Sequence, residues 1–164
     1  MKYPGLVVCL FFLAMSGCMM RAVTTTTEDW YLLQSAKDGF SIRMPQEPEH
    51  DASKNIWSLH WYDTVSEVSY WDESEKPSHS SQIFNEHIDN TLKDHDWKLL
   101  NKKFSRYKGY PSCDCEISIG DNYVVYYRYV LVKDRCYILV WRGADMPFTS
   151  AVSNNFFDSL QFSK

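Results

Sequence analysis

Three cysteines in the second half of this 164-residue chain carry side chains whose type and spacing could do chemistry. Cys113 and Cys115 are separated by one residue, and Cys136 follows further along. Thiolates are ligands for soft metals. The surrounding pattern, however, predicts adjacent antiparallel strands with Cys115 opposite about Tyr126 and Cys136 opposite about Leu131, which spreads the sulfurs apart. In this register the Cα atoms of Cys115 and Cys136 are farther apart than the roughly 7 Å that a disulfide allows. A bond between Cys113 and Cys115, two residues apart on one face, would be strained. We therefore expect no metal site, and free, largely buried thiols.

Two groupings of polar side chains are weaker candidates for chemistry. An acidic cluster surrounds the end of a predicted strand and consists of Glu67, Asp72, Glu73 and Glu75. Its spacing does not match a calcium loop, so a solvated loop is expected, although a hydrolase could combine it with His60. His87 and His95 lie eight residues apart on a predicted helix, about 12 Å along its axis and too far apart to share an ion. The chain contains no nucleotide-binding loop, zinc-protease helix or serine-nucleophile elbow.

The amino terminus has the pattern of an export signal. Lys2 precedes an apolar run from Leu6 to Met15, and Ser16 and Gly17 lead to Cys18. A positive start, an apolar core and small residues at the cut are typical of a secretory signal peptide. The run is shorter than the roughly 20 residues of a spanning helix. The segment resembles the lipobox of bacterial lipoproteins, except that Met15 stands where that family usually has leucine. The resemblance implies a signal peptide over residues 1–17 and lipidation of the Cys18 thiol.

This resemblance also implies a cellular location for the protein. Residues 18–29 contain four consecutive threonines without apolar periodicity, and we interpret them as a tether between the lipid and a domain over residues 30–164. A lipidated cysteine would attach the protein to a membrane of the bacterial cell envelope. In lipoproteins of diderm bacteria, a residue other than aspartate after the cysteine, here Met19, usually directs the protein to the outer membrane, facing the periplasm.

The composition limits the classes of function. After removal of residues 1–17, 147 residues remain, which is about the size of one domain. The formal net charge is −4, so there is no basic footprint that would indicate a nucleic-acid partner. Aromatic residues reach 16%, and such side chains favour half-buried pleated surfaces. We therefore expect a single domain rich in β-structure.

Alternating apolar and polar residues, interrupted by turn signals, predict most of the elements. Asp38 and Gly39 form a turn between two strands, and Ser80 or Ser81 caps a helix that runs to about Asp94. A second helix opens at Asp145 and Pro147. The expected strands cover 30–33, 40–44, 56–62, 65–71, 97–106, 113–119, 123–132 and 136–142, and the second helix carries its apolar stripe at Phe148, Val152, Phe156 and Leu160.

The order of these elements resembles the PsbP-like class of small exported proteins. The resemblance spans about Trp30 to Phe162. It rests on short motifs: Gly39-Phe40-Ser41-Ile42 before Pro45, a strand ending on Tyr70, Gly109-Tyr110-Pro111, Arg128, Arg135-Cys136-Tyr137 and Phe156-Phe157-Asp158-Ser159-Leu160. It implies an α+β fold, an antiparallel sheet of about six to seven strands with two helices packed on it, one on each face. Members of this class mostly serve as assembly or accessory proteins.

Exposed aromatic rings are the remaining candidates for a binding surface, because a ring on the wet face of a sheet is costly unless a partner covers it. The candidate surface comprises Trp57, Trp61, Tyr70 and Trp71, and Trp141 is a further ring of this kind. The leading hypothesis is a lipid-anchored envelope protein with a non-catalytic binding or assembly role, no cofactor, and an envelope protein or the cell wall as its partner. The alternatives are a carbohydrate or cell-wall binding module and a small envelope hydrolase.

Overall fold

The segments with strand-like or helical periodicity form strands and helices close to the expected positions. The computed structural model describes residues 29–61, 64–73, 79–93, 96–120, 123–143 and 151–163. Cys18, Glu75, His95 and the expected start of the second helix lie outside these ranges. The strands are β1 (Tyr31–Ser35), β2 (Phe40–Met44), β3 (Glu49–Asp51), β4 (Ile56–Trp61), β5 (Thr64–Asp72), β6 (Lys98–Tyr107), β7 (Tyr110–Ile119), β8 (Tyr123–Val132), β9 (Arg135–Gly143) and β10 (Gln161–Phe162), and the helices are α1 (Ser80–Lys93) and α2 (Ala151–Asp158).

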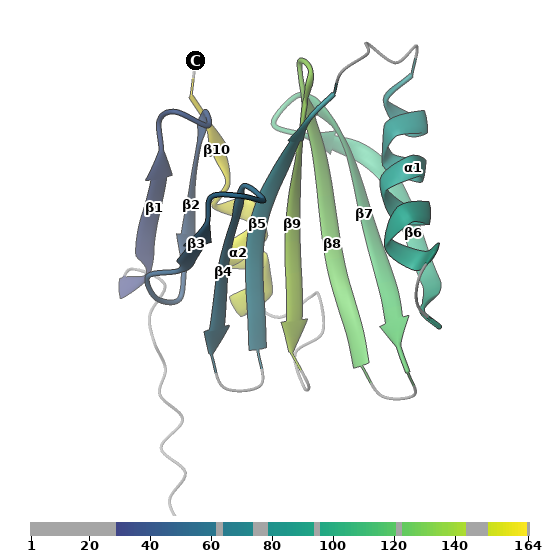
Figure 1. The fold of residues 1–164 in the computed structure, drawn as a ribbon, viewed down its shortest axis with the longest axis horizontal. Helices are drawn as coiled ribbons and strands as arrows, with labels where there is room; N and C mark the ends of the chain where they lie inside the picture. The colour runs from purple at the N-terminus through teal and green to yellow at the C-terminus, as the bar shows by residue number, and fades with distance from the viewer. Residues whose placement is uncertain are drawn as a thin grey trace, which may run out of the picture.

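These strands form two antiparallel sheets. The larger has seven strands in the order β3-β4-β5-β9-β8-β7-β6, and the smaller has three in the order β1-β2-β10 (Figure 1). The expected α+β class, the strand number of the main sheet and the two helices are therefore confirmed. The second sheet was not expected. It consists of the predicted β1–β2 hairpin and the short β10, which carries no strand signal of its own and pairs with β2 after the chain returns from α2.

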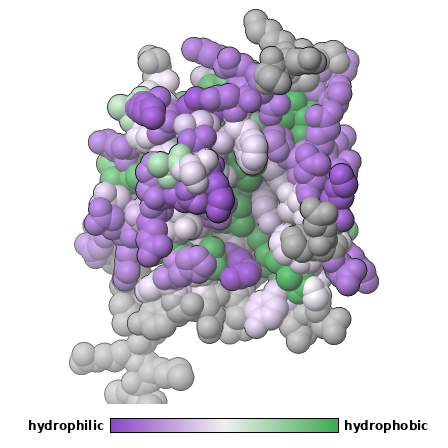
Figure 2. All heavy atoms as spheres, in the orientation of Figure 1, coloured by the Kyte–Doolittle hydropathy of each residue, from purple (hydrophilic) through white to green (hydrophobic). Residues whose placement is uncertain are grey.

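The helices lie on opposite faces of the large sheet, because both faces are apolar. On one face, Ile83, Phe84 and Ile88 form a stripe along α1 and pack on β7 and β8. On the other, Phe156 and Phe157 of α2 pack with residues of β2, β4, β5 and β9. Figure 2 shows the α1 face, on which hydrophilic residues surround a narrow hydrophobic seam beside the helix. No helix among the described residues is long and apolar enough to cross a membrane.

The meander of β7, β8 and β9 places the three cysteines nearly as expected. Cys136 pairs with Leu131, as predicted, and Cys115 pairs with Tyr127, one residue from the predicted position. All three thiols are buried and free. Burial raises the pKa of Cys113 to about 11 and that of Cys115 to about 12. The prediction of buried thiols is confirmed, and the raised pKa values keep them in the protonated, unreactive form at neutral pH.

A polar cleft at the turn end of the sheet

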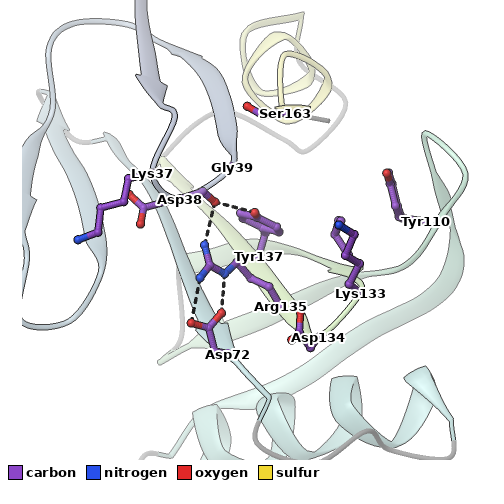
Figure 3. A pocket seen from close by; sticks show the side chains of 11 residues that line it. Lys37, Asp38, Gly39, Asp72, Tyr110, Lys133, Asp134, Arg135, Tyr137 and Ser163 are labelled. Carbon is purple, nitrogen blue, oxygen red and sulfur yellow. Dashed lines mark hydrogen bonds and ion pairs between the residues drawn. The ribbon is translucent and has the colours of Figure 1, made fainter.

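Turns from distant parts of the chain meet at one end of the large sheet, the upper end in Figure 1. The β1–β2 turn, the β8–β9 turn, the end of β5 and the start of β7 enclose a hollow of about 500 Å³, which we call the turn-end cleft. Figure 3 shows its lining, which consists of Lys37, Asp38, Gly39, Asp72, Tyr110, Val132, Lys133, Asp134, Arg135, Tyr137 and Ser163. Most of these side chains are polar, so the cleft is suited to polar or charged groups.

Arg135, the first residue of β9, lies on the floor of the cleft, together with Asp72 and Asp38. Its Nε and Nη2 donate to the two carboxylate oxygens of Asp72 at 2.5 and 2.9 Å, and its Nη1 donates to the Asp38 carbonyl at 2.9 Å (Figure 3). The guanidinium lies 3.9 Å from the centroid of the Tyr70 ring. The hydrogen bonds to Asp72 raise the pKa of Arg135 further. This bidentate pair, with the bond to the Asp38 carbonyl, fixes a permanent cation through three of its five N–H donors.

Asp38 connects the β1–β2 turn to the large sheet. It is 7% exposed, and its carboxylate accepts hydrogen bonds from the Ser35 hydroxyl and, at 2.7 Å, from the Tyr70 hydroxyl. Burial alone would raise the pKa of this carboxyl. The two hydrogen bonds, together with the charges of Lys37 and Arg135, outweigh burial and lower it. Asp38 therefore stays ionised at neutral pH as a structural group.

Gly39 allows the turn to approach β9 closely. Its φ is +77°, in the left-handed region that favours glycine, and a Cβ built there would lie 3.2 Å from the Tyr137 hydroxyl oxygen. That hydroxyl donates to the Asp38 carbonyl at 2.8 Å. The Asp-Gly pair identified in the sequence is thus a turn, as predicted, and it also forms one wall of the cleft.

The rim of the cleft differs from its floor. Lys37 and Lys133 are exposed, and within the described residues neither amine has a hydrogen-bond acceptor or an ion-pair partner. In Figure 3, Lys133 stands between Tyr137 and Tyr110, whereas Lys37 points away from Tyr137. Lys133 also has a φ of +59° at the first position of the two-residue β8–β9 loop, where glycine is the usual residue. A lysine held in this conformation is a candidate functional residue.

Three charged groups form the floor of the cleft. Arg135, Asp72 and Asp38 are held there in ion pairs and hydrogen bonds to one another and to their neighbours, which fixes their positions. Across the described residues, no three His, Cys, Asp or Glu side chains gather in a way that could hold a metal ion.

The four aromatic residues expected to form a binding surface do not share one exposed surface. Trp57 and Tyr70 are buried, with ring centroids 6.2 Å apart, and Trp61 is half-buried against the same core. Trp71 is 59% exposed, but the strand alternation places it on the opposite face, where its ring lies 6.3 Å from that of His87. Trp141 is fully buried. Sheet alternation alone could not reveal which face of each strand another layer would cover.

The acidic cluster is also divided by the structure. Asp72 pairs with Arg135, and Glu73 lies 3.0 Å from the Nε2 of His87. Glu67 is half-buried on the α1 face, where burial raises its carboxyl pKa and nearby His60 lowers it to a smaller extent. Because these acids lie at three separate places, the convergence with His60 that a hydrolase would need is not formed by the described residues.

Sequence reasoning did not assign Asp38, Lys133 or Arg135 to a site. Asp38 and Arg135 are 97 residues apart, and each lies in or beside a turn, where polar residues are ordinary. One local signal was present: the short predicted loop of Lys133, Asp134 and Arg135 between two strong strands contains neither glycine nor asparagine, the residues that favour a positive φ.

Comparison with known proteins identifies the fold. No protein-family model and no curated protein matches the sequence. Among solved structures, cyanobacterial PsbP (CyanoP) from Synechocystis sp. PCC 6803 is similar with a TM-score of 0.60 and 13% identity, over 80% of this chain and 91% of that one. The Ran-binding protein Mog1p of Saccharomyces cerevisiae is similar with a TM-score of 0.52 and 9% identity, over 82% and 95%. At such low identities the likeness concerns the fold alone, and it shows that this chain has the PsbP-like fold.

Proposed function

We propose that this chain is a lipid-anchored, non-catalytic binding protein of the bacterial cell envelope, located at the outer membrane and facing the periplasm. The export signal and Cys18 support the anchor and the address. The fold is compatible with binding, since one structural neighbour, Mog1p, is a Ran-binding protein. In this proposal the lipid holds the domain at the membrane, and the turn-end cleft holds a partner.

The main support for this proposal is the difference between the floor and the rim of the cleft. Its floor is made of charged groups that are held in hydrogen bonds to one another, whereas Lys133 on its rim is exposed, and in the described part of the chain its amine has no hydrogen-bond acceptor or ion-pair partner. A preformed, rigid floor with available donors at its edge favours recognition, because little side-chain entropy is lost on binding. The ion-paired groups of the floor are poorly suited to act as a base or nucleophile, which favours binding over catalysis.

The two alternative functions receive less support from the geometry. A carbohydrate-binding module would need the tryptophans on a common open surface, but Trp57 is buried and Trp71 lies on the other face. A hydrolase would need His60 beside several acids, and only Glu67 among the described members of the cluster is near it. Neither alternative is therefore preferred over partner binding.

Crosslinking from the cleft in living cells tests the binding role. Tyr110, on the rim, is replaced by a photoreactive phenylalanine analogue, and the control carries the same analogue at Tyr123, which is exposed at the other end of the meander. We expect a discrete adduct from position 110 and none from position 123. The adduct should weaken when Lys133→Ala is added. Equal adducts from both positions, or none from the cleft, would reject the cleft as the binding site.

Metabolic labelling with a fatty-acid analogue tests the anchor separately. The full chain should incorporate the label, and Cys18→Ala should abolish incorporation and leave the signal peptide uncleaved. Cys9→Ala is the matched control, because Cys9 lies within the apolar run and should leave labelling unchanged. Label that persists in Cys18→Ala would show that Cys18 is not the acylated residue.

A further inference from the structure

The outer edge of β6 is the most open stretch of backbone in the large sheet. β6 is the last strand in the sheet order and pairs with β7 on its inner side (Figure 1). Every residue from Lys98 to Arg106 is exposed. No other strand of the described residues pairs with the outer side, so its N–H and C=O groups are available as a template for an added strand.

This edge is strongly basic, unlike the rest of the chain. Five of the chain's 17 basic residues lie between Lys98 and Lys108, a stretch without any acidic residue. The remaining residues carry 12 basic against 21 acidic side chains, a formal charge of −9. Lys102 donates to the Asn85 side chain at 2.7 Å, which orients its amine toward α1. Lys98 and Lys103 have no partner within the described residues and remain available to an incoming group.

The exposed side chains of β6 also have an apolar face. Leu99 and Phe104 are 36% and 47% exposed, and they pair with Ile117 and Cys113, which belong to the buried cluster on the α1 side. Lys103 lies on the opposite face, because successive side chains of a strand alternate. The register is irregular at Leu100, which is 56% exposed in a β-bulge. The unbroken part of the edge is therefore Asn101–Tyr107.

We propose that β6 binds an extended acidic segment of a partner protein, which adds to the sheet as a further antiparallel or parallel strand. The segment would carry acidic side chains facing Lys103 and apolar side chains facing Phe104. This inference builds on the proposed binding role but uses a surface separate from the turn-end cleft. A second copy of the chain is a poorer occupant, because two β6 edges would place lysines opposite lysines. A lipid surface is also poorer, because it would leave the open backbone groups without partners.

The test uses a synthetic probe, the peptide Ac-Glu-Val-Glu-Thr-Glu-Val-Glu-NH2, and the full chain carrying Cys18→Ala, so that no lipid is attached. One control peptide replaces every Glu by Lys, and another replaces the central Thr by Pro, which keeps the charge but interrupts the ladder. We expect the probe to slow amide hydrogen exchange selectively in β6 and the two control peptides to fail. Fluorescence anisotropy gives the affinities.

Charge reversal on the protein separates strand addition from general attraction. Lys103→Glu should weaken probe binding at least fivefold, whereas Lys93→Glu, which makes the same change at the exposed end of α1, should change it less than twofold. Lys103→Gln provides a second variant without a new acid opposite Asp114 and should show an intermediate loss. Lys133→Ala should bind the probe normally, so failure of the cleft proposal is distinguishable from failure of this one.

Several outcomes would overturn the inference. The first is no binding at millimolar probe, and the second is equal weakening by Lys93→Glu and Lys103→Glu. Protection of β6 that rises with protein concentration in the absence of probe would assign the edge to a second copy. Binding to phosphatidylglycerol vesicles that Lys103→Glu weakens, without any binding of the peptide, would assign it to a lipid surface.

Discussion

Asp38 shows how one buried residue can organise a binding cleft. Its carboxylate accepts hydrogen bonds from Ser35 and Tyr70, while its carbonyl accepts from Arg135 and Tyr137. The residue therefore joins the β1–β2 turn to β5 and β9. Because these groups lie in the interior, removing one acceptor leaves donors unsatisfied, which costs more than the hydrogen bond itself contributes.

We predict that Asp38→Asn destabilises the domain by about 1 to 3 kcal/mol at pH 7. The folded-state pKa of Asp38 is lowered, so its contribution is fully present above the unfolded-state pKa of about 4 and is lost as the pH falls through the folded-state pKa. The gap between wild type and variant should therefore shrink toward pH 2. Urea unfolding across this pH range measures it.

Asp134→Asn serves as the control for this prediction. Asp134 lines the same cleft but is exposed, and the hydrogen bond it accepts from the Glu73 amide uses its backbone carbonyl. Its substitution should change the free energy of unfolding by less than about 0.5 kcal/mol. An Asp38→Asn gap that stays constant down to pH 2 would show that ionisation of Asp38 contributes nothing.

At the scale of elements, the turns position the cleft. Gly39 combines a positive φ with a close neighbour, the Tyr137 hydroxyl, whereas Gly109 has a similar φ of +89° and nothing within 4 Å of the position that a Cβ would occupy. Gly39→Ala should therefore cost the backbone strain of about 1 to 2 kcal/mol and also displace Tyr137. Gly109→Ala should cost the strain alone. Equal losses in thermal or urea unfolding would show that the close approach is unimportant.

The β8–β9 hairpin predicts a trade-off between stability and binding. Lys133 adopts a φ of +59° in a two-residue loop, so Lys133→Gly should raise the free energy of unfolding by about 1 kcal/mol. Both Lys133→Gly and Lys133→Ala remove the amine and should reduce crosslinking from Tyr110, but Ala keeps the strain and should bring no gain in stability. A Lys133→Gly variant that is less stable than Lys133→Ala would contradict this interpretation of the loop.

At the scale of the whole molecule, the three thiols lie in one of the two core layers, between the large sheet and α1. Cys113, Cys115 and Cys136 all belong to the cluster between the sheet and α1, and burial raises the pKa of each thiol. Reaching them requires separation of α1 from the sheet or global unfolding. The cysteines should therefore report on the stability of the assembled domain and not on local turn motions.

We predict that a full chain with Cys9→Ala and Cys18→Ala reacts with an aromatic disulfide reagent at pH 8 only very slowly in the native state. In denaturant, all three remaining thiols should react at once. The native rate should rise in parallel with the unfolding equilibrium constant as urea increases. Rapid native labelling of one thiol would show that this thiol is accessible without unfolding, and mass spectrometry would identify it.

Local patterns were sufficient for most of the fold. The Asp38-Gly39 turn, the meander and the stripe of α1 follow from alternation, turn chemistry and helical spacing, which depend on neighbouring residues. β3 and β10 were not predicted, because three- and two-residue strands have no period to detect. Their pairing with β4 and β2 depends on where the tertiary structure brings the chain.

The candidate site, in contrast, could not be derived from the order of residue types along the sequence. Trp57 and Tyr70 are of residue types that are common in binding surfaces, but they are covered because α2 and the small sheet pack on that face. Arg135 and Asp38 are 97 residues apart and become neighbours only when the turns gather at one end of the sheet. Alternation identifies two faces of a strand, but it does not show which face a later element will cover.

The sequence alone therefore defined the class of elements and the burial of the three thiols, and it predicts an export signal with lipidation at Cys18, because each depends on residues close together in the chain. The turn-end cleft, the division of the acidic residues among Arg135, His87 and the α1 face, and the open basic edge of β6 were decided by tertiary structure. Each of these depends on long-range pairing, and pairing energies come from contacts between residues that no local pattern connects.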